Sequence, residues 1–368
     1  MILEKERKLT SSRNYGVDLL RIVAMFMVLF LHILGNGGIL FELEPLSARG
    51  ITAWFFEMAT FSAINCYGII SGFVGVNSKY KYTNLVLLWL QVAAYSTLIT
   101  LVYHFRYPAL VGWDAVKMAL TPICNQQYWY VTAYAGMFLF IPILSKGAKA
   151  LTKKQLGITL IFAFVALSLL PAIYDADIFA TKWGYSLLWL SFLYLTGAYI
   201  KLYGIFKNNV KIALFVYLGT TVFSWVFKIW EEVISTEGKY ADLATGFIAQ
   251  YTSPPMLLSG IALFVVFANL DIPAFLKKAV KIISPCAFGV YIIHAHPLLW
   301  DRLITYRYAH FTSYNPFFMI LAVFFTALIM FTAFSLVDAI RLKVFNLLKI
   351  RPLLLKAEDK ITGGMWDC

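Results

Sequence analysis

The chain has 368 residues, of which 61% are hydrophobic and only 14% are charged, with a mean hydropathy of +0.74. Soluble domains are roughly 45–50% apolar and about 25% charged, so this composition excludes a soluble globular protein. Apolar residues extend along the whole chain, which excludes disorder and indicates one membrane domain over residues 1–368. The net charge of +12 does not indicate a nucleic-acid partner, because the basic residues form short clusters between apolar runs.

A helix that crosses a bilayer needs about 20 predominantly apolar residues. By this criterion the sequence predicts an all-α polytopic membrane protein with about ten transmembrane helices and a short tail at each end. The first segment is predicted to be a retained helix and not a signal peptide, because it has no A-x-A-like cleavage site. In chain order, the predicted segments are 17–34, 51–75, 84–103, 128–145, 157–173, 185–203, 210–230, 250–269, 285–304 and 316–341.

Lysine and arginine residues are concentrated in alternate connections between these segments. One set of connections, which includes both tails, contains 22 of the 31 basic residues, and the other set contains 8. Cytoplasmic loops carry the excess of basic residues, so both termini are predicted to be cytoplasmic. The other set of connections has carboxylates interleaved with aromatic residues, among them Tyr128 and Trp129. These residues could bind a sugar, but the aromatic belt of a membrane interface gives the same pattern.

Two ionisable residues, Arg21 and His32, lie inside the first apolar segment. Eleven helical positions at about 100° each leave their side chains about 20° apart around the axis and about 16 Å apart along it. They are therefore predicted to face one cavity from different depths, with Arg21 nearer the cytoplasm. A charge near the bilayer centre costs roughly 2.5–3.5 kcal/mol, which favours a functional reason for it. The alternatives are an arginine that snorkels to the inner interface and a histidine at the outer interface.

Four motifs resemble those of the acyltransferase-3 family of membrane acyltransferases, in the order in which that family has them. The family signature is a basic residue and a histidine separated by ten residues in the first helix. The other three motifs are an SG-aromatic turn, an aromatic-rich fourth segment and a late helix with the pattern FG-x-Y-x-x-H. In this chain the four are Tyr15-Gly16-Val17-Asp18-Leu19-Leu20-Arg21 with His32, Ser71-Gly72-Phe73, Tyr128-Trp129-Tyr130 leading to Pro142, and Phe288-Gly289-Val290-Tyr291-Ile292-Ile293-His294.

This resemblance implies an enzyme of the bacterial plasma membrane that transfers an acyl group, commonly acetyl, from acyl-coenzyme A. The implied acceptor is a hydroxyl of a cell-envelope saccharide or lipid-linked saccharide. Acyl-coenzyme A would be a co-substrate, with no tightly bound cofactor and no metal. His32 would act as the general base on the acceptor hydroxyl, and Arg21 would bind a coenzyme phosphate.

Several further residues are candidates for the same site. Glu57 is predicted at a depth comparable to that of His32 and could bind its second ring nitrogen, although an interface glutamate is the alternative. Tyr291 and His294 are three positions apart and share a helix face, so we assign them to substrate binding together with Tyr128 and Trp129. The alternative for His294 is a cavity or packing residue.

The start of the third helix departs from the family pattern. Many family members have arginines there, whereas this chain has only Lys79 and Lys81. Both lysines are assigned to donor binding, because lysine also binds phosphate, though as a point charge. The alternative is an ordinary basic cytoplasmic loop.

Two other classes of protein are compatible with a polar-lined membrane bundle. A transporter or flippase for an amphipathic saccharide would also need one, but it would be expected to have two similar halves with broken helices. The sequence has no convincing internal repeat. A non-enzymatic envelope scaffold leaves the cost of burying Arg21 and His32 unexplained.

Overall fold

The computed structural model describes residues 13–204, 206, 208–234 and 247–363, and every regular element within these ranges is helical. The first half of the chain forms α2 Tyr15–Leu34, α3 Ile39–Glu42, α4 Ala48–Thr60, α5 Ala63–Gly75, α6 Tyr82–Arg106, α7 Trp113–Ala119, α8 Trp129–Ala150, α9 Lys153–Phe164, the π-turn η1 Val165–Leu169 and α10 Leu170–Tyr174. The second half forms η2 Lys182–Gly184, α11 Leu187–Tyr203, α12 Val210–Ile234, α14 Pro254–Ala268, α15 Ala274–Ile283, η3 Ser284–Cys286, α16 Ala287–His294, α17 Pro297–Leu303, η4 Ala309–Ser313, α18 Pro316–Leu347 and α19 Ile350–Thr362.

Within the described residues, seven helical stretches are long and apolar enough to cross a membrane. An eighth is added if the helices from α15 to α17, which are bent by 85° at the break before α17, form one span. Helices α11 and α14 are also apolar, but they have only 17 and 15 residues. The prediction of an all-α polytopic membrane fold is confirmed, and the count of about ten spans stays a prediction.

Two of the predicted segments are interrupted in the structure. The segment at 51–75 consists of α4 and α5, which are separated by Phe61 and Ser62. The segment at 285–304 is broken before Pro297, which begins α17 and has no backbone N–H with which to continue α16. His296 caps the new helix, because its Nδ1 accepts a hydrogen bond of 3.2 Å from the Leu298 N–H. His294 therefore lies at the very end of α16.

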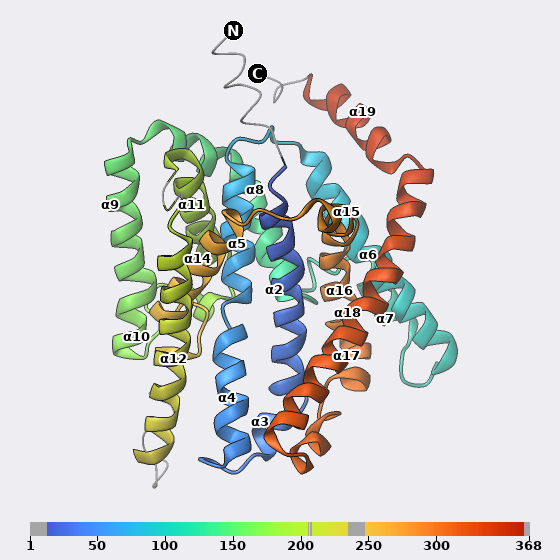
Figure 1. Cartoon of the computed structure of the whole chain (residues 1–368). Coiled ribbons are helices and arrows are strands. Elements are labelled where there is room, and N and C mark those ends of the chain that lie inside the picture. The colour runs from blue at the N-terminus through green and yellow to red at the C-terminus, as the bar shows by residue number, and fades with distance from the viewer. Residues whose placement is uncertain (1–12, 205, 207, 235–246, 364–368) are drawn as a thin grey trace.

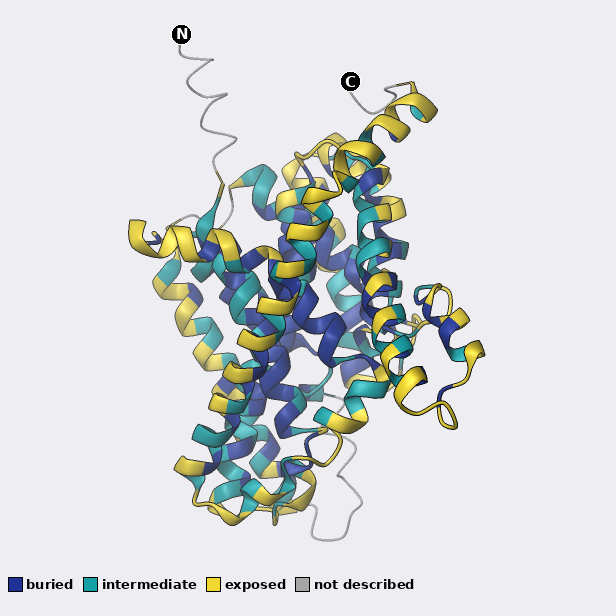
Figure 2. Cartoon of the chain, turned by 90° about the vertical axis from the view of Figure 1, so that its right-hand side faces the viewer, coloured by how far each residue is buried: buried dark blue, intermediate teal, exposed yellow. Residues whose placement is uncertain are grey.

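Helix α2 occupies the centre of the bundle, where it contacts α4, α5, α14, α15, α16 and α18 (Figure 1). Its apolar side chains are deeply buried, and Leu20, Leu29 and Ile33 have no exposed surface. Figure 2 shows the same pattern for the whole chain, with buried residues in the middle of the bundle and exposed ones at its periphery. Arg21 and His32 are thus carried by the most buried of the seven candidate membrane spans in the described part of the chain.

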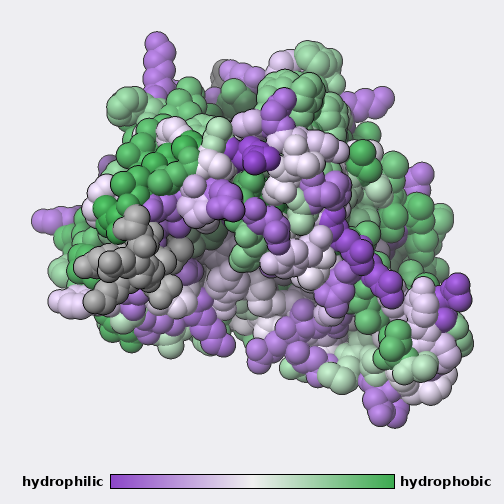
Figure 3. Space-filling view, turned by 90° about the horizontal axis from the view of Figure 1, so that it is seen from below, coloured by the Kyte–Doolittle hydropathy of each residue, from purple (hydrophilic) through white to green (hydrophobic). Residues whose placement is uncertain are grey.

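The two ends of the bundle differ in what they carry. We call the end at which α2 begins and α19 lies the terminal face, and the opposite end the far face (Figure 1). Arg21 lies toward the terminal face, and His32 lies in the last turn of α2, toward the far face. Hydrophilic side chains gather across the middle of the far face, with hydrophobic ones toward its edges (Figure 3).

Close helix packing explains one glycine of the family-like motifs. Gly72 lies where α5 meets α11, and a Cβ at this position would be 1.8 Å from the Tyr194 carbonyl oxygen. Any larger residue would have to push the two helices apart. Gly72 is therefore a packing residue that sets the distance between α5 and α11.

Candidate functional site

Two histidines from different helices meet toward the far face. His32 on α2 and His294 on α16 are 262 positions apart in sequence, yet His32 Nδ1 is 3.0 Å from His294 Nε2. The Nδ1 of His294 is 2.6 Å from the carbonyl oxygen of Val290. His294 has no exposed surface, whereas His32 is partly exposed. The pair therefore has one enclosed member and one that can be reached.

The hydrogen bonds assign the ring protons of this pair. A carbonyl oxygen can only accept a hydrogen bond. His294 Nδ1 therefore carries a proton and donates a hydrogen bond to the Val290 carbonyl oxygen. In the neutral ring the Nε2 of His294 is then an acceptor, and His32 Nδ1 donates to it. This arrangement leaves His32 Nε2 with a free lone pair. His294 thus orients His32 and presents its Nε2 as a proton acceptor.

Trp300 on α17 completes the surroundings of the two histidines. Its ring meets that of His32 edge to face, with centroids 4.8 Å apart, and lies nearly parallel to that of His294 at 6.5 Å. The bend before Pro297 brings α17 into this position. Sequence reasoning missed Trp300, although its place soon after the late histidine motif was a usable signal.

Glu57 does not make the contact that was expected of it. The residue is buried on α4, its Oε2 has no hydrogen-bond partner, and no hydrogen bond joins its carboxylate to His32 among the described residues. The ring nitrogen that Glu57 was expected to bind is bound by His294 instead. A catalytic role for Glu57 stays a prediction.

The aromatic residues that we assigned to substrate binding lie in two groups. Tyr291 lies next to His294, and Tyr128 lies next to Tyr291, with ring centroids 6.0 and 6.2 Å apart. Trp129 points into a different cluster, where its ring is 4.3 Å from that of Tyr185 and 6.0 Å from that of Tyr251. Tyr291 and Tyr128 thus adjoin the histidine pair, whereas Trp129 packs against the aromatic residues before α11 and α14.

Arg21 is held at the other end of the site by an acidic residue one turn earlier. Its guanidinium pairs with the buried carboxylate of Asp18, which also pairs with Arg13. One carboxylate faces two guanidinium groups, so the cluster retains a positive charge. The backbone carbonyl of Arg21 accepts a 2.6 Å hydrogen bond from the Tyr67 hydroxyl of α5. Arg21 is therefore fixed in place while remaining electropositive.

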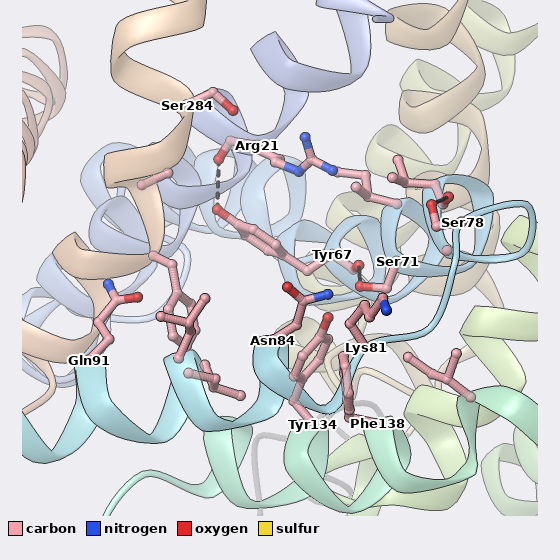
Figure 4. A pocket seen from close by; sticks show the side chains of 18 of the residues that line it. Arg21, Tyr67, Ser71, Ser78, Lys81, Asn84, Gln91, Tyr134, Phe138 and Ser284 are labelled. Atoms are coloured by element: carbon pink, nitrogen blue, oxygen red, sulfur yellow. Dashed lines mark hydrogen bonds between the residues drawn. The ribbon is translucent and has the colours of Figure 1, made fainter. Parts of the chain in front are cut away.

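A cavity of about 600 Å³ opens beside Arg21. Figure 4 shows Tyr67 from α5, Asn84 from α6 and Tyr134 from α8 converging on it, with Arg21 above them. The two lysines assigned to donor binding, Lys79 and Lys81, also line the cavity. Three of the predicted donor-site residues are thus brought together, and the volume is in the usual range for a ligand pocket.

The cavity does not extend to the histidine pair. His32 is not among its lining residues, whereas Tyr130 is. The ring of Tyr291 lies between the two sites, 6.1 Å from that of Tyr130 and 6.0 Å from that of His294. The cavity therefore includes Arg21 and not His32, so the single cavity expected to be shared by the two residues is not found in the described part of the chain, and Tyr291 adjoins both sites.

A buried ion pair, also missed by sequence reasoning, forms one wall of the cavity. Asp338 on α18 has no exposed surface and accepts two hydrogen bonds from Arg341, of 3.0 and 2.7 Å. The Tyr95 hydroxyl and the Gln91 amide of α6 donate to the same carboxylate at 2.9 and 3.3 Å. Gln91 and Arg341 also line the cavity. The network fixes α18 against α6 beside the pocket.

The C-terminal helix α19 closes against the start of α6. The carboxylate of Glu358 accepts hydrogen bonds from the backbone N–H groups of Tyr82 and Thr83, at 2.7 and 2.9 Å. Burial pushes the pKa of the Glu358 carboxyl upward, but hydrogen bonds from Thr83 and Tyr82 and the charge of Lys81 outweigh it and keep this pKa below its ordinary value. Glu358 is thus an ionised cap on the N-terminus of α6.

The comparisons with known proteins agree with this geometry. A family model described as an acyltransferase domain, of the acyltransferase-3 type, matches residues 14–337. The chain belongs to the acyltransferase-3 family. No curated protein and no solved structure matches it. As an acyltransferase-3 family member with several apolar membrane-length helices, the chain is a multi-pass membrane acyltransferase. The matched part contains Arg21, His32 and His294 and ends just before Asp338.

Proposed function

We propose that this membrane acyltransferase transfers an acyl group, with acetyl as the expected one, from acyl-coenzyme A to a saccharide hydroxyl. The acceptor is a cell-envelope saccharide or a lipid-linked saccharide, and the protein lies in the bacterial plasma membrane with its terminal face toward the cytoplasm. The basic residues Lys79, Lys81 and Arg351 at the cavity support this orientation, because they line the side from which a cytoplasmic coenzyme would enter.

The observation that carries the proposal is the arrangement of two sites along one helix. Arg21 lines a cavity near the terminal face, and His32, with its free Nε2, lies about 16 Å further along α2. Coenzyme A has its phosphates at one end and its thioester at the end of a long, thin pantetheine arm. Phosphate bound near Arg21 would allow the arm to extend along α2 toward His32.

The chemistry at His32 is general base catalysis of acyl transfer. His32 Nε2 takes the proton from the acceptor hydroxyl as its oxygen attacks the thioester carbonyl carbon. The new carbon–oxygen bond forms, the carbon–sulfur bond breaks, and the leaving thiolate takes the proton from the imidazolium. The products are the saccharide ester and free coenzyme A. His294 orients the base and accepts the hydrogen bond from His32 Nδ1 throughout.

The test uses purified full-length protein, radiolabelled acetyl-coenzyme A and a set of envelope saccharides. Wild-type protein is expected to label an acceptor, and His32→Ala is expected to reduce the rate by roughly 10²–10⁴-fold. Coenzyme A binding to His32→Ala should stay close to the wild-type value, because the cavity does not include His32. Wild-type protein that moves saccharide across vesicles without labelling it would favour the transporter alternative and contradict the proposal.

A further inference from the structure

The basic residues of the cavity form two tiers at different depths. The inner tier is Arg21, six residues and therefore about 9 Å from the start of α2. The outer tier consists of Lys79 and Lys81, before α6, and Arg351 in the first turn of α19. Polar and aromatic residues such as Ser71 and Tyr134 also line the cavity (Figure 4). Two separate anionic groups of one ligand can therefore be bound at once.

Helix α19 is anchored firmly enough to present Arg351 at a defined place. Lys349 adopts a left-handed conformation with φ of 51°, at the bend between α18 and α19 (Figure 1). The Glu358 carboxylate then caps α6, and Asp359 pairs with Lys81 at 3.4 Å. Arg351 thus reaches the cavity from a helix docked at both ends.

Arg351 lines the cavity and forms no ion pair with an acidic residue among the described residues. Arg341 is neutralised by its bidentate pair with Asp338, and Arg21 is paired with Asp18. Arg351 has no acidic partner within the described part of the chain. An exposed guanidinium without a partner, at the edge of a polar cavity, is suited to bidentate binding of a phosphate group.

We infer that the outer tier, through Arg351 on α19, binds the 3′-phosphate of the coenzyme A donor. This inference rests on the proposed function. Coenzyme A carries a pyrophosphate between its adenosine and its pantetheine arm, and a separate monoester phosphate on the 3′ oxygen of the ribose. With the arm directed along α2, the pyrophosphate lies at the inner tier with Arg21, and the 3′-phosphate stays at the mouth.

The position of Arg351 in the chain makes this contribution independent of the family motifs. The family match ends at residue 337, so α19 lies outside it. The start of α6 has Lys79 and Lys81 and no arginine before the helix. Arg351 therefore supplies, from the C-terminal helix, the planar guanidinium that this loop lacks.

The experiment compares the binding of coenzyme A and 3′-dephospho-coenzyme A by isothermal titration calorimetry, with full-length protein in nanodiscs. Arg351→Gln is expected to weaken coenzyme A binding by roughly tenfold and 3′-dephospho-coenzyme A binding by less than about twofold. Arg351→Lys should restore part of the wild-type preference for coenzyme A over 3′-dephospho-coenzyme A. The matched control is Lys356→Gln, which removes an exposed charge of the same helix that does not line the cavity.

The outcomes separate this inference from the proposed function. Wild-type protein that binds neither ligand would overturn the coenzyme A donor itself. Wild-type protein that binds coenzyme A, with Arg351→Gln unchanged or weakened equally for both ligands, would overturn only the role of Arg351. An equal loss of affinity in Lys356→Gln would also overturn the role of Arg351, because removing any positive charge from α19 would then weaken binding. Loss of the 3′-phosphate preference in Arg351→Gln alone supports the inference.

Discussion

His294 accepts a 3.0 Å hydrogen bond from His32 and, through its other ring nitrogen, donates to the carbonyl of Val290. Through these hydrogen bonds, His294 of the late motif orients His32 of the first motif. If it orients the base, His294→Leu should reduce the turnover number by roughly 10–100-fold. His294→Gln should retain more activity, because the side-chain oxygen of glutamine can accept the bond from His32. Steady-state rates with labelled acetyl-coenzyme A measure both variants, and equal activity of the two would contradict the orienting role.

Arg21 is expected to act on donor binding more than on chemistry. Arg21→Gln should raise the donor KM by about tenfold or more, because a charge-assisted hydrogen bond to phosphate is worth roughly 1.5–3 kcal/mol. The donor KM of Arg21→Lys should lie between those of the wild type and Arg21→Gln, because lysine keeps the positive charge but lacks the planar guanidinium. Initial rates over a range of acetyl-coenzyme A concentrations give the KM. A change confined to the turnover number would contradict this assignment.

Tyr291 adjoins both the cavity and the histidine pair, so its size should control transfer. Tyr291→Trp is expected to reduce the rate of acyl transfer by about tenfold or more, because the larger ring would block the pantetheine arm near its thioester end. Coenzyme A binding should be little affected, because Tyr291 does not line the cavity. Tyr291→Phe is the matched control and should transfer at a rate near that of the wild type. Equal rates for Tyr291→Trp and Tyr291→Phe would show that the acyl group takes another route.

Gly289 is a packing position in the late motif. A Cβ there would be 2.2 Å from Cγ of Asp338, whose carboxylate is buried and bonded to Arg341. Gly289→Ala should therefore destabilise the protein by about 1–3 kcal/mol through overpacking. The control is Gly219→Ala in α12, where a Cβ meets nothing within 4 Å. Thermal unfolding in detergent should show a lower midpoint for Gly289→Ala and no decrease for Gly219→Ala.

The docking of α19 should depend on pH through Glu358. Its pKa is below the ordinary value in the folded protein, so ionised Glu358 stabilises docking above its unfolded pKa of about 4.3. This stabilisation is lost as the pH falls below that value and through the lowered folded pKa. A spin label at position 356, in a variant without Cys124 and Cys368, should become more mobile below about pH 4. In Glu358→Gln the label should show no such transition, and an identical transition would exclude Glu358 as its source.

The residue spacing of α2 predicted the different depths of Arg21 and His32, but not that the cavity includes Arg21 without His32. Arg21 and His32 lie toward opposite ends of one buried helix, as eleven residues at a rise of about 1.5 Å each require. The cavity-lining positions of Lys79 and Lys81 also agree with their assignment from the sequence. These features are local, because the position of a side chain on a helix, or at its start, follows from the residues next to it.

The partner of His32 could not be predicted in this way. The sequence offered Glu57 as the partner and assigned His294 to substrate binding, whereas the residue that bonds to His32 depends on how α4 and α16 rotate against α2. Helix rotation is set by packing across the whole interface, including the close contact of Gly289 with Asp338. Trp300 was missed for the same reason, since its position depends on the 85° bend before α17.

The sequence by itself determined that this chain is an all-α membrane protein with an arginine and a histidine on its first helix, because composition and helical periodicity are properties of the chain. Only the tertiary structure decided which groups meet. It paired His32 with His294, placed Tyr291 between the cavity and the base, and brought Arg351 of α19 to the cavity. Contacts between residues far apart in the chain depend on the packing of helices, and a single sequence does not contain that geometry in any local pattern.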